Sequence, residues 1–232
     1  MYIYGRNVAK EALNKEDITK AFIYKKLNDK EIISALKQKN IKTKKLEKNE
    51  LDEIVNANHQ GIILEVNDYQ YKTLDEIEKQ EIIIILDHLE DPHNLGAIIR
   101  TCEAAGIKSI IIPKDRSVKV NGTVTKVSVG TTKYVNIAIV NNLVNTIKEL
   151  KTKGYWIIGT DMEGTDYKKI DYTGKIALVI GNEGKGLSRL VEQNCDFIAT
   201  IPMKGQVNSL NASVASAIII YEAVRNRWTI KN

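Results

Sequence analysis

The sequence predicts an α/β protein in which a parallel sheet carries helices on both faces and follows a smaller α/β unit. Stretches typical of strands and of helices alternate along the chain of 232 residues. Residues 81–87 are apolar on both faces of a strand, as in the middle of a parallel sheet. Polar residues dominate the stretch before them. We therefore expect a small domain over residues 1–67, a linker over 68–80 and a second domain over 81–232.

Each expected domain has its own alternation of elements. In the first, the patterns predict helices over residues 6–13, 30–37 and 50–57, and strands over 18–24, 41–46 and 62–66. In the second, strands are expected over 81–87, 108–112, 135–139, 155–160, 175–180 and 197–201. Helices are expected over 94–105, 123–129, 143–153 and 212–228. The apolar face of the last helix is expected to comprise Val214, Ala217, Ile218, Tyr221 and Val224.

Composition excludes several classes of protein. Cys102 and Cys195 are far apart in the sequence, which argues against a disulfide framework or a zinc site and fits a reducing cytoplasm. The N-terminus has no signal-peptide pattern, and the apolar runs are too short to span a bilayer. The net charge of +5 is mild. A basic run in the first domain fits either a solvated face or an acidic partner: Lys37, Lys39, Lys42, Lys44, Lys45 and Lys48.

Three polar loops follow strands of the second domain, and ligands of parallel sheets bind beyond the carboxyl ends of strands. In the first loop, Asn94 can cap the following helix. Arg100 lies on a different side of that helix, among apolar residues. It is either a surface arginine or one that needs an anionic partner or a water-lined pocket.

The second loop, residues 179–188, is rich in glycine. Gly181 and Gly186 have the spacing of a phosphate-binding P-loop, but Leu187 replaces the lysine that such a loop requires. A nucleotide triphosphatase is therefore excluded. Glu183 places a carboxylate among flexible backbone N–H groups, although a solvated turn would look the same.

The third loop runs from residue 201 into the last helix. Pro202 and Gly205 prevent regular structure, and polar side chains crowd the helix start, including Ser209 and Asn211. An ordinary asparagine cap explains one such residue but not the cluster. The three loops together predict a ligand site at one edge of the sheet.

The sequences DPHNLGAIIRT (91–101), IGNEGKGL (180–187) and IPMKGQVNSLN (201–211) resemble the three ordered motifs of SpoU-type RNA ribose 2′-O-methyltransferases, of the SPOUT superfamily. The first domain, with IYGR (3–6) and HQGI (59–62), is similar to the L30e-like substrate-binding domain of this family. That domain makes the 23S rRNA guanosine 2′-O-methyltransferases the nearest resemblance. The resemblance implies a C-terminal trefoil knot, a homodimer, an RNA substrate and S-adenosylmethionine as cofactor, with no metal.

The resemblance also implies residue roles. Cofactor binding is expected of Gly181, Ile201, Leu210 and, less directly, Thr160. Arg100 is expected to be catalytic, contributed from the partner subunit, either as the base or as an anchor for a phosphate near the 2′-hydroxyl. Asn94, Glu183, Ser209 and Asn211 match the other polar positions of the site. His59 fits either a structural turn or an RNA contact.

The sequence is also compatible with two other functions. The same catalytic half occurs in tRNA methyltransferases and in antibiotic-resistance methyltransferases of rRNA. A catalytically silent RNA-binding or ribosome-assembly factor is the third reading, and the intact polar residues of the motifs argue against it.

Overall fold

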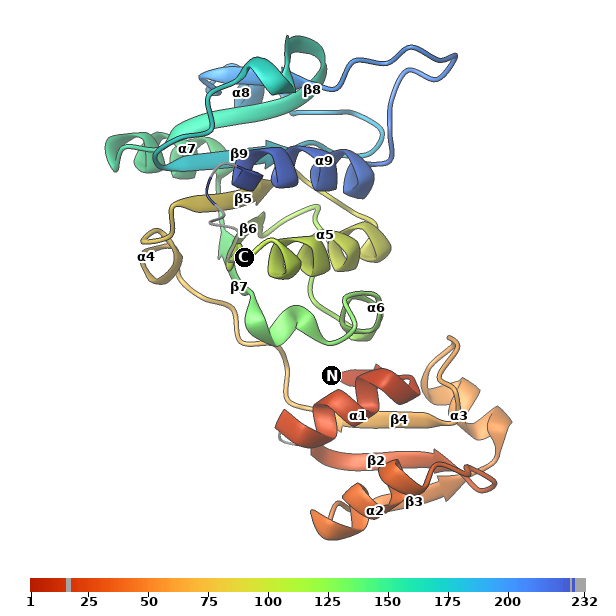
Figure 1. The fold of residues 1–232 in the computed structure, drawn as a ribbon. Coiled ribbons are helices and arrows are strands. Elements are labelled where there is room, and N and C mark those ends of the chain that lie inside the picture. The colour runs from red at the N-terminus through yellow and green to blue at the C-terminus, as the bar shows by residue number, and fades with distance from the viewer. Residues whose placement is uncertain (16–17, 226, 228–232) are drawn as a thin grey trace, which may run out of the picture. The chain divides into compact units, whose positions relative to one another are not determined.

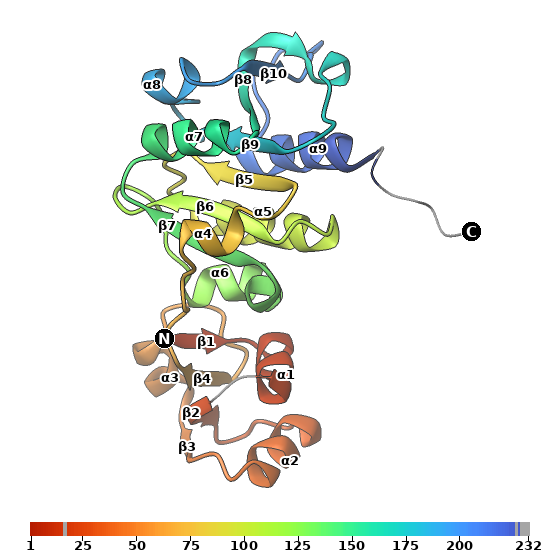
Figure 2. The same ribbon diagram turned by 90° about the vertical axis from the view of Figure 1, so that its left-hand side faces the viewer.

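The computed structural model describes residues 1–15, 18–225 and 227, and Figures 1 and 2 show its ribbon in two views. Contacts divide the chain into two units. The first comprises Met1–Gln70 with Lys119–Thr132, and the second comprises Tyr71–Val118 with the chain from Lys133 onward.

The first unit is built on a four-stranded sheet of order β1-β4-β2-β3. Its strands are β1 (Tyr2–Tyr4), β2 (Ile18–Tyr24), β3 (Thr43–Leu46) and β4 (Ile62–Val66). Only β2 and β3 pair in parallel, because β4 runs antiparallel to both of its neighbours. The helices are α1 (Arg6–Lys15), α2 (Lys30–Gln38) and α3 (Lys48–Ile54). The strand β1 was not predicted, since three residues are too short to show a period.

Side chains alternate across this sheet and form a core on each face. Ile3 and Leu64 pack with α1 and α2, whereas Tyr4 and Ile63 pack with Leu51 of α3. The sheet is therefore covered on both sides.

A helix from later in the chain belongs to the first unit. Gly122 begins α6 (Gly122–Val127), and Thr123 Oγ1 lies 2.8 Å from the hydroxyl of Tyr4. This packing against β1 groups residues 119–132 with the N-terminal sheet, although the predicted boundary placed them in the second domain. Sequence periodicity shows that a segment is helical but not which sheet it meets.

The contact between α6 and β1 predicts a strong effect of Gly122→Ala. A Cβ at Gly122 would lie 2.1 Å from the carbonyl oxygen of Tyr2, so the helix would have to shift. We expect a loss of about 2 kcal/mol in the free energy of unfolding, the typical size of an overpacking effect. Thermal or urea unfolding measures it, with Gly205→Ala as the matched control because a Cβ at Gly205 meets open space. Equal stability of the two variants would contradict the packing.

The second unit contains a six-stranded parallel sheet of order β10-β8-β9-β5-β6-β7. Its strands are β5 (Ile82–Leu86), β6 (Ser109–Pro113), β7 (Asn136–Val140), β8 (Trp156–Asp166), β9 (Ile176–Ile180) and β10 (Phe197–Thr200). Every residue of β5 is buried, which confirms its prediction as a central strand.

Helices cover both faces of this sheet, as predicted. They are α4 (Leu74–Ile77), α5 (Pro92–Ala104), α7 (Leu143–Thr152), α8 (Arg189–Glu192) and α9 (Ala212–Arg225). The helices α4, α7 and α8 share one core with alternate residues of the strands. On the other face α5 and α9 pack against each other, and α9 also contacts β9 (Figure 2). Over the residues that the structure describes, no helix has the length and apolar character needed to cross a membrane.

The face that α9 buries agrees only in part with the predicted one, because Val224 is buried and Ala217 and Ile218 are half-buried. Val214 and Tyr221 are 49% and 43% exposed, whereas Ser216, Ile219 and Ile220 are buried. The helix is apolar on most sides, so its periodicity could not identify the face that meets α5 and β9. The helix ends at Arg225, and residues 226 and 228 of the predicted span lie outside the described residues.

Candidate active site

The carboxyl ends of β5 and β9 lie side by side, with Leu86 opposite Ile180. The residue after each strand is therefore at the same edge of the sheet. Asp87 is 1% exposed, and its Oδ2 accepts a hydrogen bond of 2.6 Å from the backbone N–H of Ser188. Its Oδ1 lies 2.6 Å from Nδ1 of His88. This buried carboxylate joins the end of β5 to the glycine-rich loop, a role that no sequence motif indicated.

The glycine-rich loop closes on itself through Asn182. Its backbone N–H and carbonyl pair with those of Gly186 at 2.9 and 3.0 Å. Its side-chain oxygen accepts from the N–H groups of Gly184 and Lys185, and its Nδ2 donates to the carbonyl of His88 at 2.8 Å. The polar residue after an apolar strand was the available signal for Asn182, as it was for Asp87.

Gly181 permits this closure because it has no side chain. A Cβ at this position would lie 2.5 Å from the carbonyl carbon of Gly186 and 2.7 Å from the backbone nitrogen of Leu187. Gly186 also has φ +65°, a conformation that favours glycine. Glycine is thus required at position 181 because there is no space for a side chain, and it is favoured at position 186 because of the backbone conformation.

Three of the predicted site residues form one hydrogen-bonded network. Asn94 Nδ2 donates to Oε1 of Glu183 at 2.9 Å, and Asn211 Nδ2 donates to Oδ1 of Asn94 at 2.9 Å. Asn94 is 5% exposed, so both of its polar atoms are satisfied within the protein. Each residue comes from a different predicted motif, and the network holds the three motifs together at the edge of the sheet.

The same residues correct one expectation about helix caps and confirm another. Asn94 does not cap α5, because Asp91 occupies the cap and accepts from the N–H of His93 at 2.8 Å. Asn211 does cap α9, accepting from the N–H of Ser213 at 2.9 Å and of Val214 at 3.3 Å. Asn211 therefore combines the role of a helix cap with a place in the network.

Arg100 and Ser209 stand apart from this network. Both side chains are exposed, and neither bonds to Asn94, Glu183 or Asn211 among the residues that the structure describes. Residues 202–209 are all exposed, between the half-buried Ile201 and Leu210. The long connection from β10 to α9 is visible as an extended loop in Figure 1.

The predicted cofactor residues lie on neighbouring elements of the second unit. Thr160 pairs with Ile180 in the β8–β9 ladder, next to Gly181, and its hydroxyl donates to the carbonyl of Val179 at 3.1 Å. The strand β8 continues to Asp166, so Thr160 lies within it, not at its end as predicted. Gly181 is buried against the backbone of Gly186 and Leu187, and Ile201 and Leu210 are half-buried.

The cysteines offer no nucleophile. Burial raises the pKa of the Cys102 thiol, and burial raises the pKa of Cys195 to about 12. Both thiols are therefore protonated at neutral pH and behave as core residues.

Carboxylates gather at one place outside the site. Oxygens of Asp75, Glu78 and Glu149 lie within 4.8 Å of one another. The Lys153 ammonium bonds to Glu78 and to Glu149, and these bonds raise the pKa of Lys153. A lysine thus already supplies the positive charge that such a group of carboxylates needs.

The position of Asp87 predicts that Asp87→Ala destabilises the protein. The Ser188 N–H and His88 would lose their acceptor in a buried place, which costs about 1–3 kcal/mol. Urea unfolding measures the loss. Asp87→Asn should recover part of it, because its oxygen can still accept from Ser188. The matched control is Asp91→Asn, which preserves the cap of α5. An alanine variant as stable as the original chain would contradict this role.

Comparison with known proteins agrees with this arrangement. The model of the SpoU rRNA Methylase family matches residues 81–221, and the model of RNA 2′-O ribose methyltransferase substrate binding matches residues 2–72. A Staphylococcus aureus (strain COL) protein assigned to the TrmH family of tRNA/rRNA methyltransferases is 43% identical over an alignment of 240 residues, gaps included. The alignment covers 98% of this chain and 97% of the relative. A Bacillus subtilis (strain 168) protein of the same assignment is 40% identical over 238 residues, covering 97% and 96%.

A solved structure has the same architecture over both units. The SpoU methyltransferase AviRb from Streptomyces viridochromogenes, in complex with its cofactor AdoMet, superimposes with a TM-score of 0.80 at 25% sequence identity. The superposition covers 98% of this chain and 90% of AviRb. The family models, the relatives and the shared fold lead to one conclusion: the chain belongs to the SpoU rRNA methylase family.

Proposed function

We propose that this protein is an S-adenosylmethionine-dependent RNA ribose 2′-O-methyltransferase whose target is a guanosine of 23S rRNA. One observation carries the proposal: the network of Asn94, Glu183 and Asn211 joins all three motifs at the edge of the sheet where ligands bind. Family membership supports the reaction, and the AdoMet complex of AviRb supports the cofactor.

The cofactor supplies an electrophilic methyl group on a sulfonium. Gly181 and Thr160 would hold it on one side, and Ile201 and Leu210 on the other. The expected trefoil knot is part of the proposal, formed where residues 180–187 and 201–211 pass each other. In this arrangement the segment 202–209 folds over the bound cofactor and brings Ser209 to the reacting ribose.

The chemistry that the protein must add is positioning and charge. The 2′-oxygen would attack the methyl carbon as the carbon–sulfur bond breaks, which gives the 2′-methoxy group and S-adenosylhomocysteine, and the 2′-hydroxyl proton would pass to solvent water. Arg100 stays protonated, so it acts as an anchor for a phosphate next to the attacking hydroxyl. Glu183, held at Oε1 by Asn94, orients the nucleotide and offsets the charge of Arg100.

We propose that the active unit is a homodimer. Arg100 is exposed on α5 and, among the described residues, does not bond to the network of its own subunit. Val214 and Tyr221 leave apolar surface exposed on α9, which packs beside α5. An interface over these two helices would bring Arg100 of one protomer to the site of its partner.

The test uses the full chain with methyl-labelled S-adenosylmethionine and separated 23S rRNA, 16S rRNA and tRNA. We expect label in 23S rRNA, at a ribose that resists alkaline cleavage on its 3′ side. Label only in tRNA would overturn the ribosomal target. No label in any RNA, including precursor ribosomal particles, would favour the RNA-binding factor.

A further inference from the structure

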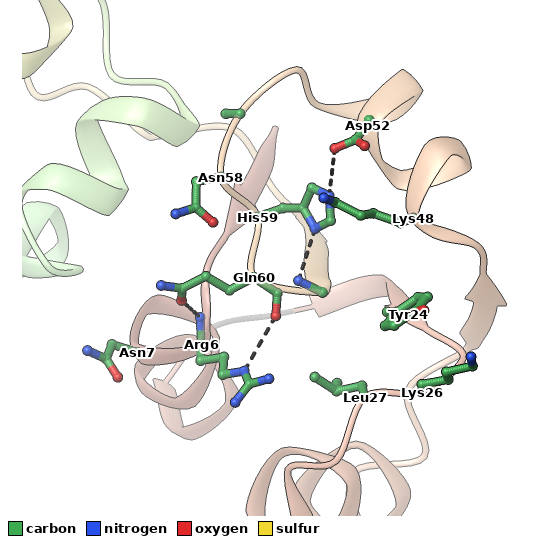
Figure 3. A pocket seen from close by; sticks show the side chains of 12 residues that line it. Arg6, Asn7, Tyr24, Lys26, Leu27, Lys48, Asp52, Asn58, His59 and Gln60 are labelled. Atoms are coloured by element: carbon green, nitrogen blue, oxygen red, sulfur yellow. Dashed lines mark hydrogen bonds and ion pairs between the residues drawn. The ribbon is translucent and has the colours of Figure 1, made fainter.

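The first unit contains a cavity of about 800 Å³ that the proposed chemistry does not use. It lies between the start of α1, the end of β2, the helix α3 and the loop that leads into β4, and Figure 3 shows it from close by. Its size is in the range of sites for small organic groups.

Positive charge surrounds this cavity. Arg6, Lys26 and Lys48 line it, and all three side chains are exposed. None of them forms a salt bridge within the described ranges, in contrast to the neighbouring Lys25, which pairs with Glu47 at 3.1 Å. The cavity therefore presents three cations that no carboxylate of the described ranges neutralises. Of the basic run 37–48, only Lys48 lines it.

The one carboxylate of the lining is already engaged. His59 is 4% exposed, and its Nδ1 accepts from the N–H of Gly61 at 3.0 Å. The proton must then be on Nε2, which lies 3.0 Å from Oδ1 of Asp52. His59 thus has no polar atom left for a ligand. His59 therefore fixes the shape of the loop, which favours a structural role for this histidine over a direct contact with RNA.

The loop that His59 fixes presents other groups to the cavity. Gln60 has φ +56°, and its side-chain oxygen accepts from the backbone N–H of Arg6 at 2.8 Å. Arg6 Nε in turn donates to the carbonyl of Gln60 at 3.4 Å, which directs the guanidinium along the cavity (Figure 3). The amides of Asn7 and Asn58 lie at the same rim. A ligand would meet preformed donors, acceptors and charge.

An aromatic ring completes the lining. Tyr24 is half-buried at the end of β2 and lines the cavity, and its backbone N–H donates to the carbonyl of Gly61 at 2.8 Å, which joins β2 to the same loop. Leu27 adds a buried apolar side chain beside it. An aromatic ring next to amides and to cations without a salt bridge is the combination that unstacked bases and their phosphates require.

We infer that this cavity binds one unpaired nucleotide of the RNA substrate, with the base against Tyr24 and the flanking phosphates on Arg6 and Lys48. The inference rests on the proposed function, because that function makes RNA the substrate. An acidic peptide would satisfy the cations alone but would leave the ring and the amides unused. The lining of the cavity therefore favours RNA over an acidic peptide as the ligand.

The test measures binding of a fluorescent single-stranded oligouridylate of about eight nucleotides, a length typical of one single-strand site, to the full chain without cofactor. Tyr24→Leu keeps the apolar packing and removes the π-face, and we expect about tenfold weaker binding. Tyr24→Phe should restore it. Arg6→Ala with Lys48→Ala should lower the dependence of affinity on salt by about 0.7 for each lost phosphate contact.

Controls separate the cavity from diffuse charge. Lys37→Ala with Lys39→Ala removes two exposed cations outside the cavity and should leave the affinity almost unchanged. An equal loss in both double variants would overturn the inference. Equally tight binding of the same sequence as a duplex, or equal competition by polyglutamate, would also overturn it. Binding of the oligouridylate by a protein that transfers no methyl group would support the nucleotide site and contradict the proposed function.

Discussion

Replacing Arg100 by alanine is expected to lower methyl transfer about 10²–10³-fold, the usual loss when one charge-stabilising group is removed. The affinity for S-adenosylmethionine should stay unchanged, because Arg100 is exposed on α5 and is not one of the residues expected to bind the cofactor. Single-turnover transfer and calorimetric cofactor binding measure the two quantities. Arg189→Ala on α8 is the matched control, since it removes an exposed arginine outside the proposed site. A turnover unaffected by Arg100→Ala would contradict the role.

Mixing two inactive variants tests whether Arg100 acts across the dimer. Protomers with Arg100→Ala keep a cofactor site, and protomers with Gly181→Ala keep the arginine. If the arginine acts in the partner's site, random reassociation should restore about a quarter of the activity, because half of the dimers then contain one complete site. An arginine that acts within its own subunit predicts no recovery.

Gly181→Ala is expected to weaken S-adenosylmethionine binding about 10–100-fold, as an overpacked site loses its geometry. The added Cβ would lie 2.5 Å from the carbonyl carbon of Gly186, and its three nearest neighbours are all backbone atoms of the Gly186–Leu187 peptide, so no flexible side chain can yield. The loop would have to open, and it carries Glu183 of the network. Calorimetric titration of the cofactor measures the loss.

The neighbouring Gly184 provides the control for this change. A Cβ at Gly184 would meet only Oδ1 of Asn182 at 3.7 Å, an ordinary contact. Gly184→Ala should therefore bind the cofactor as the original chain does. If both variants bind normally, the closed loop is not the cofactor site. If both fail, the loop needs flexibility, and the steric argument is wrong.

The elements predicted well are those whose patterns are local. The strand β5 is apolar at every position because helices cover both faces of the sheet, so its burial is evident from five residues. The short β1 was not predicted, because three residues are too few to show a period. The predicted apolar face of α9 was right for Val224 but wrong for Val214 and Tyr221, because the helix is apolar on most sides.

In the site, too, local sequence motifs were predicted well, and contacts between residues far apart in the sequence were not. The motifs identified Asn94, Glu183 and Asn211, but no pattern indicated that Asn94 would leave the cap to Asp91 and bond to both of the others. Nor did a motif indicate Asp87, whose carboxylate reaches Ser188 across 101 positions. These contacts depend on β5 and β9 being neighbours in the sheet.

The class of fold, the order of most elements and the three polar loops are evident in the amino-acid sequence, because periodicity, glycine and proline act on their immediate surroundings. Three features depend on the folded chain: the packing of α6 on the first sheet, the bonds of Asn94 to residues 89 and 117 positions away, and the exposure of Arg100. Strand order and helix packing set those contacts, and both are properties of the folded chain as a whole.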